Sequence, residues 1–166
     1  MTYRVEPLDD HELDSFQCGV DELDEWLIYH ARTATGQGTR TYVLVDEDAS
    51  VVGYFAITPH LLRREEAPAR VARGVPREIP AILLAKLAVD RSRQGSGLGS
   101  EMLVSAIGTI VDAARRAGGR LIVVDAINDQ ARSFYEHHDF QPLPDNDRRL
   151  VIKISTAAQA LGIDWP

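Results

Sequence analysis

The feature that most restricts the fold is a glycine-containing turn between an apolar strand and a long amphipathic helix. Residues 82–89 are nearly all apolar, which predicts a strand buried on both faces. The polar turn 90–99 follows it directly. Apolar residues then recur at helical spacing over 98–114, and Gly118 and Gly119 are typical of a helix end. A chain with this order of elements belongs to the classes that mix strands and helices.

The chemistry of this turn depends on its main chain. Backbone N–H groups over 94–99, with the positive end of the helix dipole, would point toward a bound pyrophosphate, and Arg91 and Arg93 add charge nearby. A glycine turn can also do no more than connect a strand to a helix. A Walker loop needs a lysine that Gly97-Leu98-Gly99-Ser100 lacks, and a dinucleotide fold would place such a turn in an N-terminal βαβ unit. Both nucleotide folds are therefore disfavoured.

The rest of the chain predicts a mixed α/β architecture, a mostly antiparallel sheet flanked by helices. Strands alternate with helices in the second half and pair as a hairpin in the first. An irregular segment rich in proline and arginine interrupts this pattern. The expected elements are a helix at 20–34, strands at 41–45 and 51–57, the irregular segment 58–80, a strand at 121–126, a helix at 129–138 and a strand at 150–154 entered from 142–147.

Length and composition limit the organisation further. A chain of 166 residues, 45% of them hydrophobic, can bury one core, so we expect a single domain over 1–166. Cys18 is the only cysteine, which excludes an intramolecular disulfide, and no Cys/His spacing suggests a metal site. Neither a signal peptide nor an apolar run of membrane-spanning length is present. We therefore expect a soluble cytoplasmic protein without metal.

Charge is distributed unevenly along the sequence. The net charge of -7 argues against indiscriminate nucleic-acid binding, which needs an excess of Lys and Arg. Residues 1–30 carry nine acidic side chains against Arg4 alone. Residues 61–93, in contrast, carry seven arginines and Lys86 against four acidic side chains. The acidic total hides a basic segment that could contact phosphates.

Two motifs make the sequence resemble the GNAT acetyltransferase family. The family pattern Gln/Arg-x-x-Gly-x-Gly/Ala is matched by Gln94, Gly97 and Gly99, and the stretch 126–140 is similar to the family's second signature. The resemblance implies acetyl-CoA as cofactor, with the strand before the turn contacting its pantetheine arm. The residues implied to bind the coenzyme are Leu87, Ala88, Val89, Arg93, Gln94, Gly95, Ser96, Gly97, Leu98, Gly99, Asn128 and Tyr135.

Tyr135 is the candidate general acid. Attack of an amine on a thioester expels a thiolate, which a phenol within hydrogen-bond reach can protonate. By residue type alone Tyr135 could equally be a core aromatic. In GNAT proteins a backbone N–H of the central strand faces the developing oxyanion, and the resemblance assigns this role to Val89 or its neighbour. No side-chain base is evident, although Glu65 and Glu66 are possible.

A closer resemblance, to the GNAT toxins of bacterial toxin-antitoxin pairs, rests on the segments 16–27, 40–45 and 86–91. Those toxins acetylate the α-amine of aminoacyl-tRNA and are countered by a small DNA-binding antitoxin. An α-amine, with a reference pKa near 8, also suits a site without a strong base. The resemblance implies charged tRNA as acceptor, a ribbon-helix-helix antitoxin and a possible homodimer. Five arginines would contact the acceptor's phosphates, namely Arg63, Arg64, Arg70, Arg73 and Arg77.

Two alternatives remain open from the sequence. One is a GNAT enzyme that acetylates a small-molecule amine or a protein amine. The other is a noncatalytic module that binds coenzyme A or an antitoxin without consuming an acceptor, which the presence of Tyr135 disfavours. The arginines could equally form a solvated loop. Cys18 is a better candidate for a buried small residue than for a nucleophile, because no histidine partner is indicated.

Overall fold

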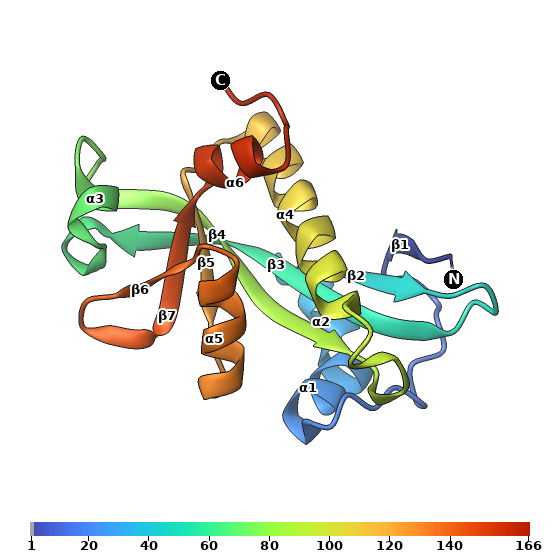
Figure 1. The fold of residues 1–166 in the computed structure, drawn as a ribbon. Helices are drawn as coiled ribbons and strands as arrows, with labels where there is room; N and C mark the ends of the chain where they lie inside the picture. Colours follow the sequence, from blue (N-terminus) through green and yellow to red (C-terminus); the bar gives the residue numbers. More distant parts are fainter. Residues whose placement is uncertain (1) are drawn as a thin grey trace. The chain divides into compact units, whose positions relative to one another are not determined.

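The computed structural model describes residues 2–166 and contains a seven-stranded sheet. Contacts divide the chain into two units, each built from two segments. Unit 1 holds the residues up to Thr58 together with Ala85–Ala106, and unit 2 holds Pro59–Leu84 together with Ile107–Pro166. Strands alternate with helices along the sequence (Figure 1), which confirms the predicted mixed α/β class.

Unit 1 begins with three antiparallel strand segments followed by a fourth. Strand β1 (Arg4–Pro7) pairs with β2 (Arg40–Val45), and β2 pairs with the first part of β3 (Val51–Arg63). The second part of β4 (Glu78–Val89) follows β3 in the strand order. Strand β1 was not predicted, because its short sequence Arg-Val-Glu-Pro alternates too briefly to be distinguished from a loop.

The helical segment of unit 1 covers the predicted region but is not one regular helix. Helix α1 (Asp21–Glu25) continues through a π-helical turn at Trp26–His30 into α2 (Ala31–Thr35). Leu27 and Tyr54 are fully buried in the core beneath it, and the Tyr54 hydroxyl donates to the Leu23 carbonyl oxygen at 2.7 Å. The predicted apolar stripe therefore packs inward as expected, while the wider turn was not anticipated.

Helix α4 (Leu98–Ala117) confirms the clearest prediction from the sequence. The apolar residues that recur at helical spacing are buried, and Gly118 and Gly119 adopt positive φ angles of 93° and 139° just after it ends. The Gly118 N–H donates to the Ala114 carbonyl oxygen at 2.7 Å, which closes the last turn.

Unit 2 contains the parallel strand pair and the C-terminal hairpin. Strand β5 (Leu121–Asp125) pairs in parallel with the first part of β4 and antiparallel with β7 (Asn146–Lys153), which also pairs with β6 (Gln141–Leu143). Helix α5 (Asp129–His137) lies beside the β6–β7 hairpin (Figure 1). The unit is completed by the short helix α3 (Ala69–Ala72) and by α6 (Ile154–Ala160).

The prediction of an irregular segment over 58–80 was wrong at both ends. Strand β3 continues to Arg63 and β4 already begins at Glu78, so only the middle is a loop, with a 3-10 turn and α3. Leu62 and Ile79 are fully buried, and this burial stabilises strand structure where prolines and arginines weaken the sequence pattern.

The C-terminal part of the chain also differs from the prediction. The last strand begins at Asn146, and Ile154, expected to end it, starts helix α6 instead. The Ile154 N–H donates to the Arg120 carbonyl oxygen at 2.9 Å, while Ala157 and Ala158 are buried. Two small buried residues give too weak an apolar stripe to predict such a helix.

Candidate active site

The first residue of the glycine turn, Asp90, forms hydrogen bonds with other segments of unit 1. The Asp90 N–H donates to the Val52 carbonyl oxygen at 2.8 Å, which ends β4, and the Asp90 carboxylate accepts from the N–H groups of Gln17 and Ser92 at 2.9 and 3.1 Å. These bonds hold the pKa of Asp90 below its ordinary value against the opposing effect of burial, which is the largest single influence on it. A charged Asp90 thus anchors the start of the turn.

Gln94 supports the turn through its side chain. The Nε2 amide donates to the Cys18 carbonyl oxygen at 2.6 Å and to the Val89 carbonyl oxygen at 2.9 Å. The Gln94 N–H points back into the preceding 3-10 turn, toward the Arg91 carbonyl oxygen at 3.4 Å. The side chain expected to bind the coenzyme therefore makes contacts within the protein that fix where the turn leaves β4.

Arg93 is also engaged by the protein. Its Nη2 atom lies 2.7 Å from the Asp46 carboxylate in the β2–β3 turn, and the two side chains are 22% and 6% exposed. Asp46 accepts two further bonds from the N–H groups of Asp48 and Ser50. Arg93 therefore neutralises a buried carboxylate, and the charge that it can offer to a ligand is reduced accordingly.

The main chain after Gln94 is suited to hold a diphosphate. Gly95 and Gly97 have φ angles of 82° and 83°, and a Cβ placed on either would meet no heavy atom within 4 Å, so the space over the turn is open. The Gly97 carbonyl oxygen accepts from the Glu101 N–H at 3.2 Å, so the N–H groups of Leu98 and Gly99 precede the first helical bond. Open glycines and helix-terminal N–H groups fit the diphosphate of coenzyme A.

The end of β4 presents a second set of backbone groups. Asp90 donates toward β3, and because successive N–H groups of a strand alternate in direction, those of Leu87 and Val89 point to the opposite edge. Pairing of β4 with β5 runs only from Ala81 to Leu84. Leu87 and Val89 thus lie beyond the last paired residue, where a thioester or pantetheine amide could accept their N–H bonds.

Tyr135 occupies the middle of α5 in unit 2 and is 7% exposed. Its ring makes edge contacts with Phe134 and Phe140, with centroids 5.4 and 5.5 Å apart. Burial, with a smaller effect of the Asp125 charge, raises the pKa of the phenol above its ordinary value. Burial therefore makes this phenol a weaker acid than an exposed tyrosine, and the hydroxyl is protonated at neutral pH.

Asn128 begins α5 as its N-cap. The side-chain Oδ1 accepts from the Ala131 N–H at 2.8 Å, so the amide nitrogen is the part of this side chain that can donate to a ligand.

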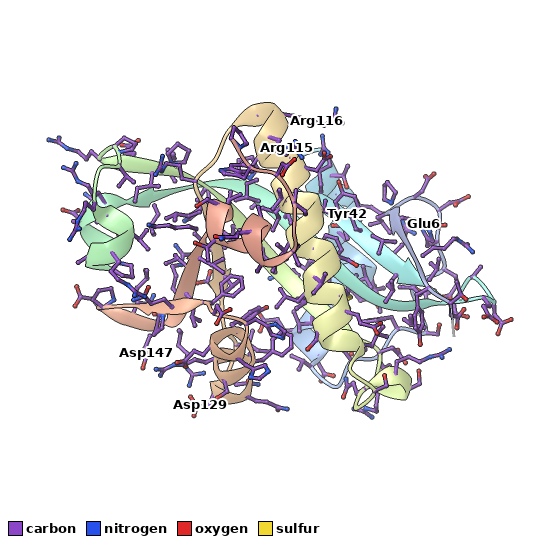
Figure 2. The ribbon with its side chains drawn as sticks, turned by 45° about the horizontal axis from the view of Figure 1, so that its top comes forward. Glu6, Tyr42, Arg115, Arg116, Asp129 and Asp147 are labelled. Atoms are coloured by element: carbon purple, nitrogen blue, oxygen red, sulfur yellow. The ribbon has the colours of Figure 1, made fainter. Side chains whose placement is uncertain are left out.

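Two ion pairs connect the first part of α5 to β7, and a third lies within α5. Arg132 lies 2.9 Å from both Glu136 and Asp147, and Arg148 lies 2.7 Å from Asp129. Figure 2 shows Asp129 on α5 and Asp147 on the hairpin. Each pair is partly exposed and contributes at most about 1 kcal/mol, but together they oppose rotation of the helix that carries Tyr135.

Four of the five predicted acceptor arginines share one cavity. Glu65 and Glu78 are its acidic members, and its volume is about 990 Å³. Arg64 is fixed there by a bond from Nη1 to the Val75 carbonyl oxygen at 3.2 Å. Arg70, on α3, does not line the cavity. The arginines of this basic cavity are Arg63, Arg64, Arg73 and Arg77.

The two glutamates considered as bases differ in their surroundings. Glu65 lies 3.3 Å from Arg63, and both side chains are 70% exposed. Glu66 instead lines a second cavity, of about 370 Å³, together with Asp125 and Arg149.

The sequence did not indicate a cluster at the carboxyl end of β5. Arg149 binds the Asp125 carboxylate through Nε at 2.7 Å and Nη2 at 2.8 Å, and its Nη1 lies 3.0 Å from His60 Nε2. Burial and the Arg149 charge lower the pKa of His60. His60 and Arg149 are 89 residues apart, and no local pattern joins such positions.

Two comparisons with known sequences address the family directly. Residues 37–142 match the model described as the acetyltransferase (GNAT) domain. A tRNA-acetylating toxin of Mycobacterium tuberculosis (strain ATCC 25618 / H37Rv) is 39% identical over 96% of this chain and 95% of its own.

Solved structures agree with these matches. AtaT complexed with acetyl-methionyl-tRNAfMet has a TM-score of 0.87 at 27% identity, covering 96% of this chain and 99% of that one. A tyrosine mutant of AtaT bound to the C-terminus of the antitoxin AtaR and to acetyl-CoA has a TM-score of 0.81 at 26% identity, covering 96% and 98%.

With a GNAT domain model that matches residues 37–142 and a relative that is 39% identical over 96% of the chain, this chain belongs to the GNAT family of acetyltransferases. It is an N-acetyltransferase whose acyl donor is acetyl-CoA, which supplies an activated acetyl thioester. No helix formed by residues 2–166 has the length and apolar character needed to span a bilayer. Within the same residues, no three His, Cys, Asp or Glu side chains gather as a metal site.

Proposed function

We propose that this acetyltransferase is a toxin that acetylates the α-amine of aminoacyl-tRNA and thereby blocks translation. The observation that carries the proposal is the 39% identity to a tRNA-acetylating toxin over 96% of the chain. The basic cavity supports it, because four arginines against two glutamates favour a phosphate-rich acceptor over a small amine. Since charged tRNA is cytoplasmic, this acceptor assigns the protein to the cytoplasm. We assign residues 1–166 to one GNAT domain because the relative matches nearly throughout.

In this proposal the N–H groups over 95–99 bind the coenzyme diphosphate, because the Gln94 N–H is already directed at the Arg91 carbonyl oxygen, and Asn128 donates through its amide nitrogen. The backbone N–H of Val89 stabilises the negative charge that develops on the acetyl oxygen. Tyr135 donates its proton to the departing thiolate, a role supported by its position in the stretch 126–140 that is similar to the family's second signature.

The acceptor α-amine has a reference pKa near 8, which leaves a usable neutral fraction at pH 7. This property suits a site without an assigned base. The basic cavity would position the phosphates of the acceptor.

The test uses the purified protein with acetyl-CoA and a set of charged tRNAs, and mass spectrometry detects the acetylated aminoacyl-adenosine. We expect modification of charged but not of uncharged tRNA. Tyr135→Phe should lower turnover about 100-fold or more while acetyl-CoA affinity stays nearly constant, because only the proton donor is lost. Absence of product from every charged tRNA, with acetylation of polyamines or protein lysines instead, would refute the tRNA acceptor.

We also infer that an antitoxin of the ribbon-helix-helix class binds this toxin and that the toxin forms a homodimer. The support is that AtaT has been solved bound to the C-terminus of the antitoxin AtaR and that KacTA has been solved with DNA. Light scattering of the purified chain gives its oligomeric state. Co-expression with a small DNA-binding protein encoded beside it tests the antitoxin, and failure to co-purify would contradict this inference.

A further inference from the structure

Strand β1 has an outer edge to which no strand of residues 2–166 is paired. It is the first strand in the sheet order and pairs with β2 alone (Figure 1). The Leu8 N–H, just after β1, donates to the Thr41 carbonyl oxygen of β2 at 2.9 Å. Because the backbone groups of successive residues point in opposite directions, the N–H and C=O of Val5 point away from β2. They can therefore bond to a further strand.

The side chains of β1 alternate between two faces. Arg4 and Glu6 lie on one face, where Arg4 Nε is 3.2 Å from the Glu6 carboxylate. A hydrogen bond with His11, of 2.8 Å, and the contact with Arg4 hold the pKa of Glu6 below its ordinary value, so this carboxylate is charged at neutral pH. Val5 lies on the other face and is 39% exposed. The edge thus presents a cation, an apolar residue and an anion in this order.

This order is complementary to itself when two copies of β1 pair antiparallel. With Val5 opposite Val5 of a second copy, each Arg4 faces a Glu6, and the two Val5 residues exchange N–H to C=O bonds. A pairing centred on Arg4 would place two arginines opposite each other. A pairing centred on Glu6 would do the same with two glutamates. Like charges disfavour both of these, so the charges favour the register centred on Val5.

The Val5 face adds apolar surface to the same edge. Val5 lines a cavity of about 290 Å³ in unit 1, and Glu101 and Ser105 of α4 line it too. Val104, between these two on α4, is 44% exposed. Since residues three apart are neighbours on a helix surface, Val104 lies beside Glu101 at the border of this cavity. Two exposed apolar side chains therefore border one hollow next to the unpaired edge, as at surfaces that bind another protein.

We propose that a second copy of this chain pairs with β1 through its own β1, antiparallel and centred on Val5, to form a two-fold symmetric dimer. This inference rests on the homodimer inferred above and names its surface. The charges of Arg4 and Glu6, together with Pro7, which lacks an N–H, disfavour pairing with other strand edges. An edge of four residues covers less than the roughly 800 Å² per partner of a typical stable complex, so the dimer should dissociate in the micromolar range or above.

The test changes the charges of the edge and follows molecular mass by sedimentation velocity over a range of concentrations. Arg4→Glu makes acidic side chains face each other across the two-fold axis, and Glu6→Arg does the same with basic ones. Each variant alone should have a dissociation constant at least about tenfold above the native value. An equimolar mixture of the two should dimerise like the native chain, because every acid then faces an arginine. Arg116→Glu, at an exposed arginine of α4, is the control and should change nothing.

Three results would overturn the inference. One is a native chain that stays monomeric up to millimolar concentration. Another is a dimer that both single variants form as readily as the native chain. The third is a mixture of folded variants that fails to pair. Circular dichroism and urea unfolding of each variant separate loss of pairing from loss of folding, since Glu6→Arg also removes the contact with His11.

Acetylation of charged tRNA by the native chain is measured separately, because Arg4, Val5 and Glu6 have no part in the site proposed for the coenzyme. Absence of acetylation would refute the proposed function and leave the dimer surface standing. Acetylation by a native chain that never dimerises would refute the dimer surface and leave the proposed activity standing.

Discussion

Variants of Arg93 test whether bonds within the protein hold the glycine turn in place or whether the turn becomes ordered only when the coenzyme binds. The Arg93–Asp46 pair is 2.7 Å long, and Asp46 is only 6% exposed. Arg93→Met would leave this carboxylate without its cation. Removal of one partner from a fully buried pair costs about 3–5 kcal/mol. Because Arg93 is 22% exposed and Asp46 keeps two backbone N–H donors, we expect a smaller loss, about 1.5–3 kcal/mol of unfolding free energy.

The assay is a double-mutant cycle in urea with Arg93→Met, Asp46→Asn and the double variant. The side-chain amide introduced by Asp46→Asn would keep an oxygen that accepts hydrogen bonds from the N–H groups of Asp48 and Ser50. It would lose the negative charge that attracts Arg93. We expect a coupling of about 1–2 kcal/mol between the two sites. Energies that add within about 0.3 kcal/mol would refute the view that this pair holds the turn.

Acetyl-CoA titration of the same variants separates two roles for Arg93. If the pair only holds the turn, both single variants should lose affinity by similar factors, because either change frees the same segment. If Arg93 contacts the diphosphate as the sequence predicted, Arg93→Met alone should lose affinity, and the loss should shrink at high salt.

Three further predictions concern single sites. Gly53→Ala should cost about 1–3 kcal/mol in urea unfolding, because its Cβ would lie 2.7 Å from Met102 Sδ and 3.2 Å from a β4 carbonyl oxygen; an unchanged midpoint would contradict this. The pKa of His60, measured by NMR, should lie below its ordinary value of 6.5. The stability that neutral His60 contributes is therefore present above pH 6.5 and is lost as the pH falls through the pKa of the folded state. Arg149→Gln should raise the pKa of His60, and an unchanged pKa would contradict the effect of the Arg149 charge. Burial raises the Cys18 pKa to about 12, so iodoacetamide at pH 8 should label the unfolded but not the native protein.

The sequence predicted the elements whose signals are local. The apolar strand, the glycine turn and α4 follow one another within about forty residues, and each has its own pattern, so their order, the end of the strand and the start of α4 were correct. The limits of β3 and β4 were missed because they depend on the burial of Leu62 and Ile79 by residues distant in sequence. The prolines and arginines of the segment 58–80 predict a loop, but at both ends of the segment tertiary contacts stabilise strands instead.

In the candidate site, too, the local sequence predicted some features and not the long-range contacts. Gly95 and Gly97 were predictable because an open turn with positive φ requires glycine. The partners of Gln94 and Arg93 were not, since Cys18 and Asp46 lie 76 and 47 residues away. A motif identifies which residues recur at such a site but not which of their groups are already bonded within the protein.

If the turn binds the coenzyme diphosphate as proposed, these long-range bonds explain how a turn with two flexible glycines can do so. Ordering one backbone residue costs about 1–2 kcal/mol, so a free turn would subtract several kcal/mol from the affinity for the coenzyme. Asp90, Gln94 and Arg93 each bond to a segment of unit 1 outside the turn, and folding therefore fixes the residues on which the turn starts. The glycines between Gln94 and α4 then have few conformations left to lose. Binding energy from the N–H groups is thus available for affinity, provided that these three anchors act before the coenzyme arrives.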